Sequence, residues 1–268
     1  MSRSPVKGEQ MPFVDSAGRE LTSIELGQVP VTAPTFQLRE RIGYVEAGAS
    51  PEKITWAEAH IPDTAPSPGN RTDLASVPLV FWSLIASYGR QTAAAVVHDS
   101  ECWRVRQSAL PVVDALAERE RIDRAFRLGL RELGVAPFRA WLMWTFVSFE
   151  RYQKHSIPRF IGMLALGILG LALVVVGAIL AFSGIPAAVA VLAVPLATSA
   201  IGGRHWRLLV WASYAGALLL PIAVLQVAAY LPYLAIENIV WALVDLPRSK
   251  GSPVVGPTDL RNLRRLGN

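Results

Sequence analysis

Two short segments near the N-terminus alternate apolar and polar side chains, which is the pattern of a half-buried β-strand. They cover residues 36–46 and 53–61, and both are rich in β-branched and aromatic residues. The stretch 62–73 is dense in turn-forming residues and predicts a loop. Residues 1–34 show no sustained pattern, so we expect a flexible tail with at most one short strand.

Four helices are predicted after this loop, over residues 78–89, 90–106, 112–133 and 137–154. Gly134 is the expected stop of the third helix, and Pro137 suits the first turn of the fourth. Strands followed by helices are typical of an α+β fold. We therefore expect a small soluble α+β domain over residues 35–158, with a few strands and about four helices.

Long apolar runs follow this domain. Residues 160–182 carry no charge, and 23 residues of helix at about 1.5 Å each are long enough for the roughly 30 Å hydrocarbon core of a bilayer. Further apolar runs cover residues 185–201 and 208–236. The expected transmembrane region, residues 159–247, is all-α and has three spans, or four if residues 231–246 turn back.

The composition excludes a wholly soluble protein. Apolar residues make up 52% of the chain and charged residues only 18%, against about a quarter in ordinary soluble domains. The net charge of +5 is a weak sign of a nucleic-acid partner, because the excess lies beside the apolar runs and in the basic C-terminal tail, residues 248–268. Basic residues there orient membrane segments or meet anionic lipid. We expect the lipid bilayer as a partner and no nucleic acid.

Charges that flank the apolar runs predict the orientation of the chain. Basic residues precede the first run and separate the second from the third: Arg151, Lys154, Arg159, Arg204 and Arg207. The N-terminal domain is thus expected in the cytoplasm, on an integral protein of the inner membrane. The single cysteine fits that reducing compartment. The N-terminus lacks the apolar core of a signal peptide, so internal segments are expected to direct insertion.

Two glycines of the first apolar run, Gly170 and Gly177, lie seven residues apart and share one helix face. Such a face permits close contact between helices, including those of a second copy in a homo-oligomer. Glycine is also common in membrane helices in general, and both explanations stand at this point.

One carboxylate falls on the apolar face of the predicted third helix. Steps of 3.6 residues from Leu116 reach Asp123, Phe126 and Leu130. A carboxylate on a buried face needs a compensating partner or a metal ion. The five arginines of the same helix, at positions 119, 121, 124, 127 and 131, are interleaved with glutamates, which favours a solvated face over the alternative of an anion or lipid site.

Two further polar clusters join Asp123 as candidates for chemistry. His98 and Asp99 interrupt an alanine- and valine-rich run, and Asp73 ends the predicted loop. Imidazole and carboxylate groups suit a divalent cation that activates a water molecule. We predict a metal site built from Asp73, His98, Asp99 and Asp123, with His98 and Asp99 also catalytic.

Each of these residues also has a structural explanation. Asp73 would cap a helix that begins near Ser76, His98 would be a satisfied core histidine, and Asp99 would pair with an arginine. A different chemistry uses Ser76 as a nucleophile, with His98 as its base and Asp99 or Asp123 as the orienting acid. Ser76 lies in Ala75-Ser76-Val77-Pro78, which is no G-x-S-x-G elbow.

Three motifs together resemble a known family. They are TDLASVPLVFW (72–82), YGRQTAAAVVHD (88–99) and RIDRAFRLGLRELGVAPFRAWLMW (121–144). In this order they resemble the phage- and prophage-associated family catalogued as domain of unknown function 1353. The resemblance covers roughly residues 36–144.

The resemblance implies that Asp73, Ser76, His98, Asp99 and Asp123 are the family's polar positions. The chain departs from the family where Ser-Glu-Cys-Trp follows the His-Asp dipeptide in place of x-Leu-Tyr, and where isoleucine precedes Asp123 in place of alanine or glutamate. The membrane segment is an addition to the usual short form. The family has no established activity, so it supports the fold and the site more than a function.

Two functions remain from the sequence. The first is a membrane-anchored, metal-dependent hydrolase of a phosphoester or an amide, in a bacterium or prophage. The second is a non-catalytic phage or prophage membrane protein, involved in assembly, exclusion or lysis, whose aspartate and histidine cluster is structural.

Overall fold

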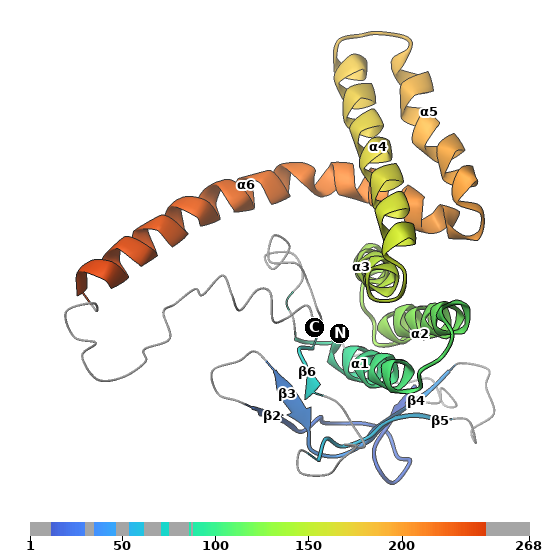
Figure 1. Ribbon diagram of the computed structural model, residues 1–268, viewed down its shortest axis with the longest axis vertical. Coiled ribbons are helices and arrows are strands. Elements are labelled where there is room, and N and C mark those ends of the chain that lie inside the picture. Colours follow the sequence, from blue (N-terminus) through green and yellow to red (C-terminus); the bar gives the residue numbers. More distant parts are fainter. Residues whose placement is uncertain are drawn as a thin grey trace, which may run out of the picture. The chain divides into compact units, whose positions relative to one another are not determined.

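The computed structural model describes residues 12–29, 35–46, 54–61, 71–74, 86 and 88–244. Within them, short strands come first and helices follow, so the chain has the predicted α+β order (Figure 1). The chain divides into two compact units, Met1–Ala217 and Leu218–Asn268. The first unit contains the strands and all the candidate site residues that the structure describes.

Among the described residues, six strands form two small antiparallel sheets, in the orders β1-β4-β5 and β2-β3-β6. Their bounds are β1 Phe13–Val14, β2 Leu26–Gln28, β3 Phe36–Leu38, β4 Ile42–Val45, β5 Ile54–Ala57 and β6 Arg71–Thr72. The single strand predicted over residues 36–46 is thus two strands in different sheets. Three consecutive charged residues, Arg39, Glu40 and Arg41, separate them, because their side chains break the alternation that one buried strand needs.

The N-terminal segment is more ordered than a flexible tail would be. Residues 12–29 contain β1 and β2, which pair with β4 and β3. Phe13 and Val14 are buried, and Phe13 packs against Tyr44 with ring centroids 5.0 Å apart. Burial of these side chains stabilises strands that are too short to be recognised by alternation.

Three helices follow the strands, within two residues of the predicted bounds: α1 Thr92–Gln107, α2 Val112–Glu132 and α3 Pro137–His155. Gly134 follows α2 with a φ of +74°, a conformation that glycine adopts without strain. Pro137 lies in the first turn of α3, as predicted. The helix predicted over residues 78–89 falls mainly outside the described residues.

The apolar half differs from the prediction of three or four spans. Its elements are α4 Ile157–Phe182, α5 Ala188–Ser199, the short 3₁₀ helix η2 Ala200–His205 and α6 Trp206–Val244. Among the described residues, only α4 and the segment Gly202–Leu243 are long and apolar enough to cross a membrane. α5 has 12 residues, which is too short.

The prediction that residues 231–246 turn back as a fourth span is wrong for the described residues, which end at residue 244. α6 continues through Pro221 and Pro232 to Val244. Proline removes one backbone hydrogen bond, but membrane helices tolerate this loss when neighbouring groups satisfy the freed carbonyl. Two prolines therefore do not mark the end of a span here.

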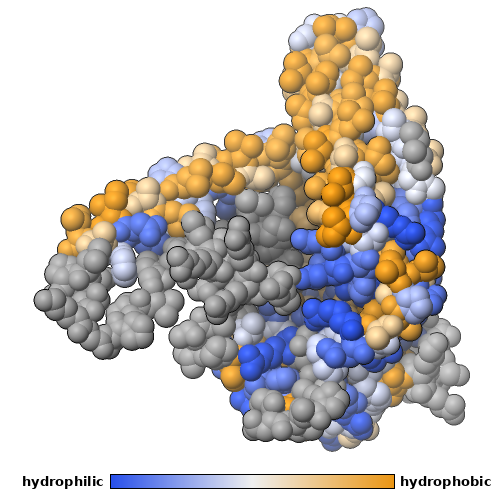
Figure 2. All heavy atoms as spheres, viewed as in Figure 1, coloured by the Kyte–Doolittle hydropathy of each residue, from blue (hydrophilic) through white to orange (hydrophobic). Residues whose placement is uncertain are grey.

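Within the first unit, α4 packs against α5 and α3. Gly170 lies against Ser213 and Gly177 against Leu192, so both glycines are buried within the chain itself. Apolar side chains cover most of the visible surface of α4 and α5 (Figure 2). Such a surface is what a helix presents to lipid.

Candidate functional site

α1 lies between the first sheet and α2 and carries His98 on its buried side. The helix contacts β4, β5, β6 and α2. The preceding run Ala93–Val97 is fully buried, and its small side chains allow the close approach of these elements. His98 itself is buried in this layer.

Asp123 of α2 faces His98 from the neighbouring helix. Its side chain is 0% exposed, on the apolar face that the helical spacing predicted. His98 Nε2 lies 3.0 Å from Asp123 Oδ1, and Arg151 Nη1 of α3 donates a 2.8 Å hydrogen bond to Asp123 Oδ2. One carboxylate therefore joins α1, α2 and α3, and each of its oxygens has a partner.

Asp99 lies on the other side of the histidine ring. Asp99 Oδ1 is 3.7 Å from His98 Nδ1, while the Thr72 hydroxyl of β6 donates to Asp99 Oδ2. The same hydroxyl oxygen accepts a 2.9 Å hydrogen bond from the backbone N–H of Leu74. Leu74 has a φ of +66°, an uncommon conformation for a bulky residue. The end of β6 is thus held against α1 at Asp99.

Two more side chains complete the surroundings of the ring. Cys102 lies one helical turn after His98, with Sγ 3.5 Å from Nε2, and the Phe126 ring centroid is 4.8 Å from that of His98. Burial by itself lowers the pKa of His98, but Cys102, Asp123 and Asp99 together hold the pKa well above its ordinary value. The ring is therefore a more basic proton acceptor than a free imidazole.

The predicted residues are brought together only in part. His98, Asp99 and Asp123 meet, whereas Asp73 is exposed and Ser76 lies outside the described residues. In the part of the chain that the structure describes, no three histidine, cysteine, aspartate or glutamate side chains are placed to hold a metal ion. The metal ligands and the catalytic residues expected from the sequence therefore remain predictions.

Two buried arginines differ from the expectation of solvated charges. Arg119 is expected on a solvated face but is only 1% exposed, and its Nη2 is 3.9 Å from Glu150 Oε2. Arg151, expected as a charge that flanks the membrane, is buried against Asp123. The helical spacing contained a signal for Arg119, because residue 119 precedes Asp123 by one turn on the same face.

A small cavity of about 20 Å³ lies beside His98, between the first sheet and the helices α1 and α2. Its apolar lining includes Phe13, Tyr44, Val97, Ile122 and Phe126, and its polar lining includes His98, Glu101 and Arg121. A mainly apolar cavity with a few polar groups is typical of a small-molecule site.

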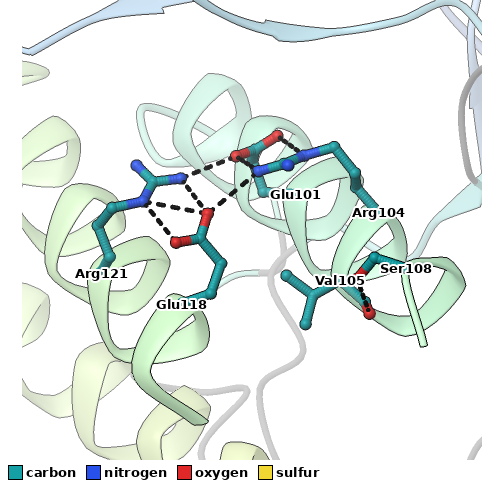
Figure 3. Close-up of polar contacts among 6 residues, drawn as sticks. All are labelled: Glu101, Arg104, Val105, Ser108, Glu118 and Arg121. Carbon is teal, nitrogen blue, oxygen red and sulfur yellow. Dashed lines mark hydrogen bonds and ion pairs between the residues drawn. The ribbon is translucent and has the colours of Figure 1, made fainter. Parts of the chain in front are cut away.

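A network of ion pairs lies beside this pocket (Figure 3). Its four members are Glu101, Arg104, Glu118 and Arg121. Arg121 donates from Nη2 to Glu101 Oε2 at 3.1 Å and to Glu118 Oε1 at 2.9 Å, and Arg104 donates from Nε to Glu101 Oε1 at 2.9 Å. These contacts connect α1 to α2. They also fix the carboxylate of Glu101 and the guanidinium of Arg121 where both line the pocket.

Residues 62–147 match the family described as Protein of unknown function (DUF1353). This segment of the chain is a DUF1353 family domain, and it includes Asp73, His98, Asp99 and Asp123. The family description states no activity. No curated protein and no solved structure matches the chain.

Proposed function

We propose that this chain is a membrane-anchored hydrolase in which His98 is the general base and Asp123 orients it. The proposal depends on one observation, the 3.0 Å contact between His98 Nε2 and the fully buried Asp123. A carboxylate at Nε2 accepts the proton on that nitrogen, so Nδ1 is the nitrogen that takes up a proton once the ring is neutral, at a pH above the raised pKa of His98. A buried aspartate that orients a histidine base is recurrent in hydrolases, where it usually contacts Nδ1 and leaves Nε2 as the base, whereas here the two nitrogens exchange these roles.

Arg151 supports the orientation of the base. Its hydrogen bond to Asp123 Oδ2 fixes the carboxylate that in turn fixes the imidazole. A charge-assisted hydrogen bond of this kind is shorter and stronger than one between neutral groups. Arg151 is therefore a positioning residue, and His98 is the group that accepts a proton from water or another nucleophile.

The pocket beside His98 suggests the class of substrate. Its aromatic and aliphatic lining suits the acyl part of an ester or amide, and Arg121 offers a charged group at the same cavity. We therefore propose an acyl ester or amide as the substrate. The phosphoester alternative needs a metal ion to neutralise charge, whereas His98 can act as a base on an acyl substrate without one.

The site is close in sequence to the first apolar helix. α3 carries Arg151 and ends at His155, and α4 begins at Ile157. If α4 spans the bilayer, the basic residues Arg151, Lys154 and Arg159 place the hydrolytic domain on the cytoplasmic side of the inner membrane. A lipid ester is then the nearest acyl compound. The phage or prophage setting and a homo-oligomer remain predictions from the sequence.

A divalent cation is a separate part of the proposal. Asp99 is the carboxylate that such an ion would use, because its Oδ1 has only the 3.7 Å contact to His98, whereas both oxygens of Asp123 have partners at hydrogen-bonding distance. Metal analysis of the purified full chain should find one equivalent of a divalent ion in the wild type and less in Asp99→Asn. An equal metal content in both proteins would contradict a metal site at Asp99.

The hydrolase proposal is tested with His98→Gln. The glutamine amide can still donate to Asp123, but it cannot act as a base. We therefore expect the rate of hydrolysis to fall by about 10²- to 10⁴-fold. The full chain in detergent would be assayed for hydrolysis of p-nitrophenyl esters of increasing acyl length and of phosphatidylglycerol vesicles. Gln107→Ala, at an exposed position of the same helix, is the control and should retain the wild-type rate.

A second candidate function is favoured by the same carboxylate. Because Asp123 ties α1, α2 and α3 together, a non-catalytic membrane protein would also need it. In that case the wild type hydrolyses none of these substrates, and His98→Gln changes only the melting temperature. That result would replace the hydrolase with the structural explanation.

A further inference from the structure

Arg119 is a buried cation, and two of its three guanidinium nitrogens have no hydrogen-bonding partner among the described residues. Its side chain is 1% exposed, and both Nε and Nη2 are enclosed and make no hydrogen bond there. The nearest carboxylate, Glu150, is 3.9 Å away, which is too long for a hydrogen bond. A charged group buried in this state is costly, so its free N–H groups indicate a missing acceptor.

The charges around Arg119 indicate that the missing acceptor is an anion. Asp123, one turn away, already binds both His98 and Arg151, and Asp99 accepts from Thr72. On the facing helix α3, Ser148 Oγ and His155 Nε2 are also enclosed and have no partner in the described part of the chain. Burial and the positive charges of Arg119 and Arg106 lower the pKa of His155. The α2–α3 interface thus contains several enclosed polar atoms that have no hydrogen-bonding partner among the described residues.

This interface lies next to the start of the first apolar helix. Leu116, one turn before Arg119, belongs to a buried cluster with Tyr152 and Leu208, and Phe160 and Met163 of α4 pack against this cluster. Glu120, the next residue after Arg119, is 3.1 Å from Arg204 of η2. An anion at Arg119 would therefore lie close to the lipid-facing end of the domain.

We propose that Arg119 is the centre of an oxyanion site that binds a phosphate group. The planar guanidinium matches two oxygens of a phosphate through Nε and Nη2, which are the two atoms left free here. Glu150 is the acid nearest to Arg119 and is itself 40% exposed, so it can turn towards solvent while the phosphate takes its place. The group comes from a lipid headgroup or from free phosphate. The hydrolase proposal does not use Arg119, so the two proposals stand independently.

The experiment measures binding to the full chain in neutral detergent by calorimetry, with sodium phosphate and with dihexanoyl phosphatidic acid as separate probes. Loss of a charge-assisted pair in Arg119→Met should raise the Kd by about tenfold to hundredfold. Arg124→Met, at an exposed position of the same helix, should leave the Kd within about twofold, as expected of a rim charge. If both probes bind, free phosphate is a sufficient ligand for the site. If only the lipid binds, the ligand is a phosphate group in a lipid headgroup.

Three results would overturn the site. They are no binding of either probe by the wild type, an equal loss in Arg124→Met, and unchanged binding in Arg119→Met. If Arg119→Met does not fold, Glu150→Gln decides, because removal of the competing carboxylate should tighten binding of the same probe. Unchanged or weaker binding in Glu150→Gln would then reject the proposal.

Discussion

Asp123→Ala should lower the free energy of unfolding by about 3–5 kcal/mol, the typical cost of removing one partner from a buried ion pair. The carboxylate is fully buried and accepts from Arg151 at 2.8 Å while it contacts His98 at 3.0 Å. Its removal leaves the guanidinium of Arg151 and the imidazole of His98 in the core without the carboxylate that lay between them. No solvent reaches them to compensate.

The measurement is chemical denaturation of the full chain in detergent, followed by the fluorescence of tryptophan residues in α3. Asp114→Ala is the matched control, because Asp114 is exposed in the first turn of the same helix and interacts mainly with the helix dipole. Its loss should cost less than about 1 kcal/mol. Equal effects of the two substitutions would show that Asp123 is not the carboxylate that joins the three helices.

A double variant separates the charge from the packing. Asp123→Leu with Arg151→Met replaces the salt bridge by apolar groups of similar size, and such replacements are often neutral or stabilising. We expect the double variant to lose less stability than the sum of the losses in Asp123→Leu and Arg151→Met. Strict additivity would mean that Arg151 and Asp123 do not interact in solution.

The central part of this site was predictable because a helix has a fixed period. Steps of 3.6 residues put Asp123 among apolar side chains, and the structure buries it there. The same steps reach Arg119, but the alternation of arginine and glutamate along the helix argued for solvent. Arg151 could not be assigned, because its partner comes from another helix and only tertiary packing brings the two together.

The β-structure was less predictable than the helices. β1 has two residues and β6 has two, so neither is long enough for a recognisable alternation. Their pairing with β4 and β3 depends on residues distant in sequence. The predicted number of membrane spans was wrong for another reason. Hydropathy gives the length of an apolar run but not the residue at which the helix within it ends. α5 accordingly ends after 12 residues.

Gly170→Val should destabilise the packing of α4 against α6. A side chain at Gly170 would overlap Ser213 Oγ and lie 2.9 Å from Ser213 Cβ, closer than two carbon atoms approach. Small residues let apolar helices approach each other closely, and a branched side chain at this point forces them apart. We expect a loss of about 1–3 kcal/mol, as is typical of overpacking a close-packed interior.

Gly162→Val is the control on the same helix, because a side chain at Gly162 meets nothing within 4 Å. Thermal unfolding of the full chain in detergent should show a lower melting temperature for Gly170→Val and little change for Gly162→Val. Ser213→Gly combined with Gly170→Ala should recover part of the loss of Gly170→Ala alone, since it removes both overlapping atoms. Equal melting temperatures for the two valine variants would mean that α4 does not contact α6 at Gly170.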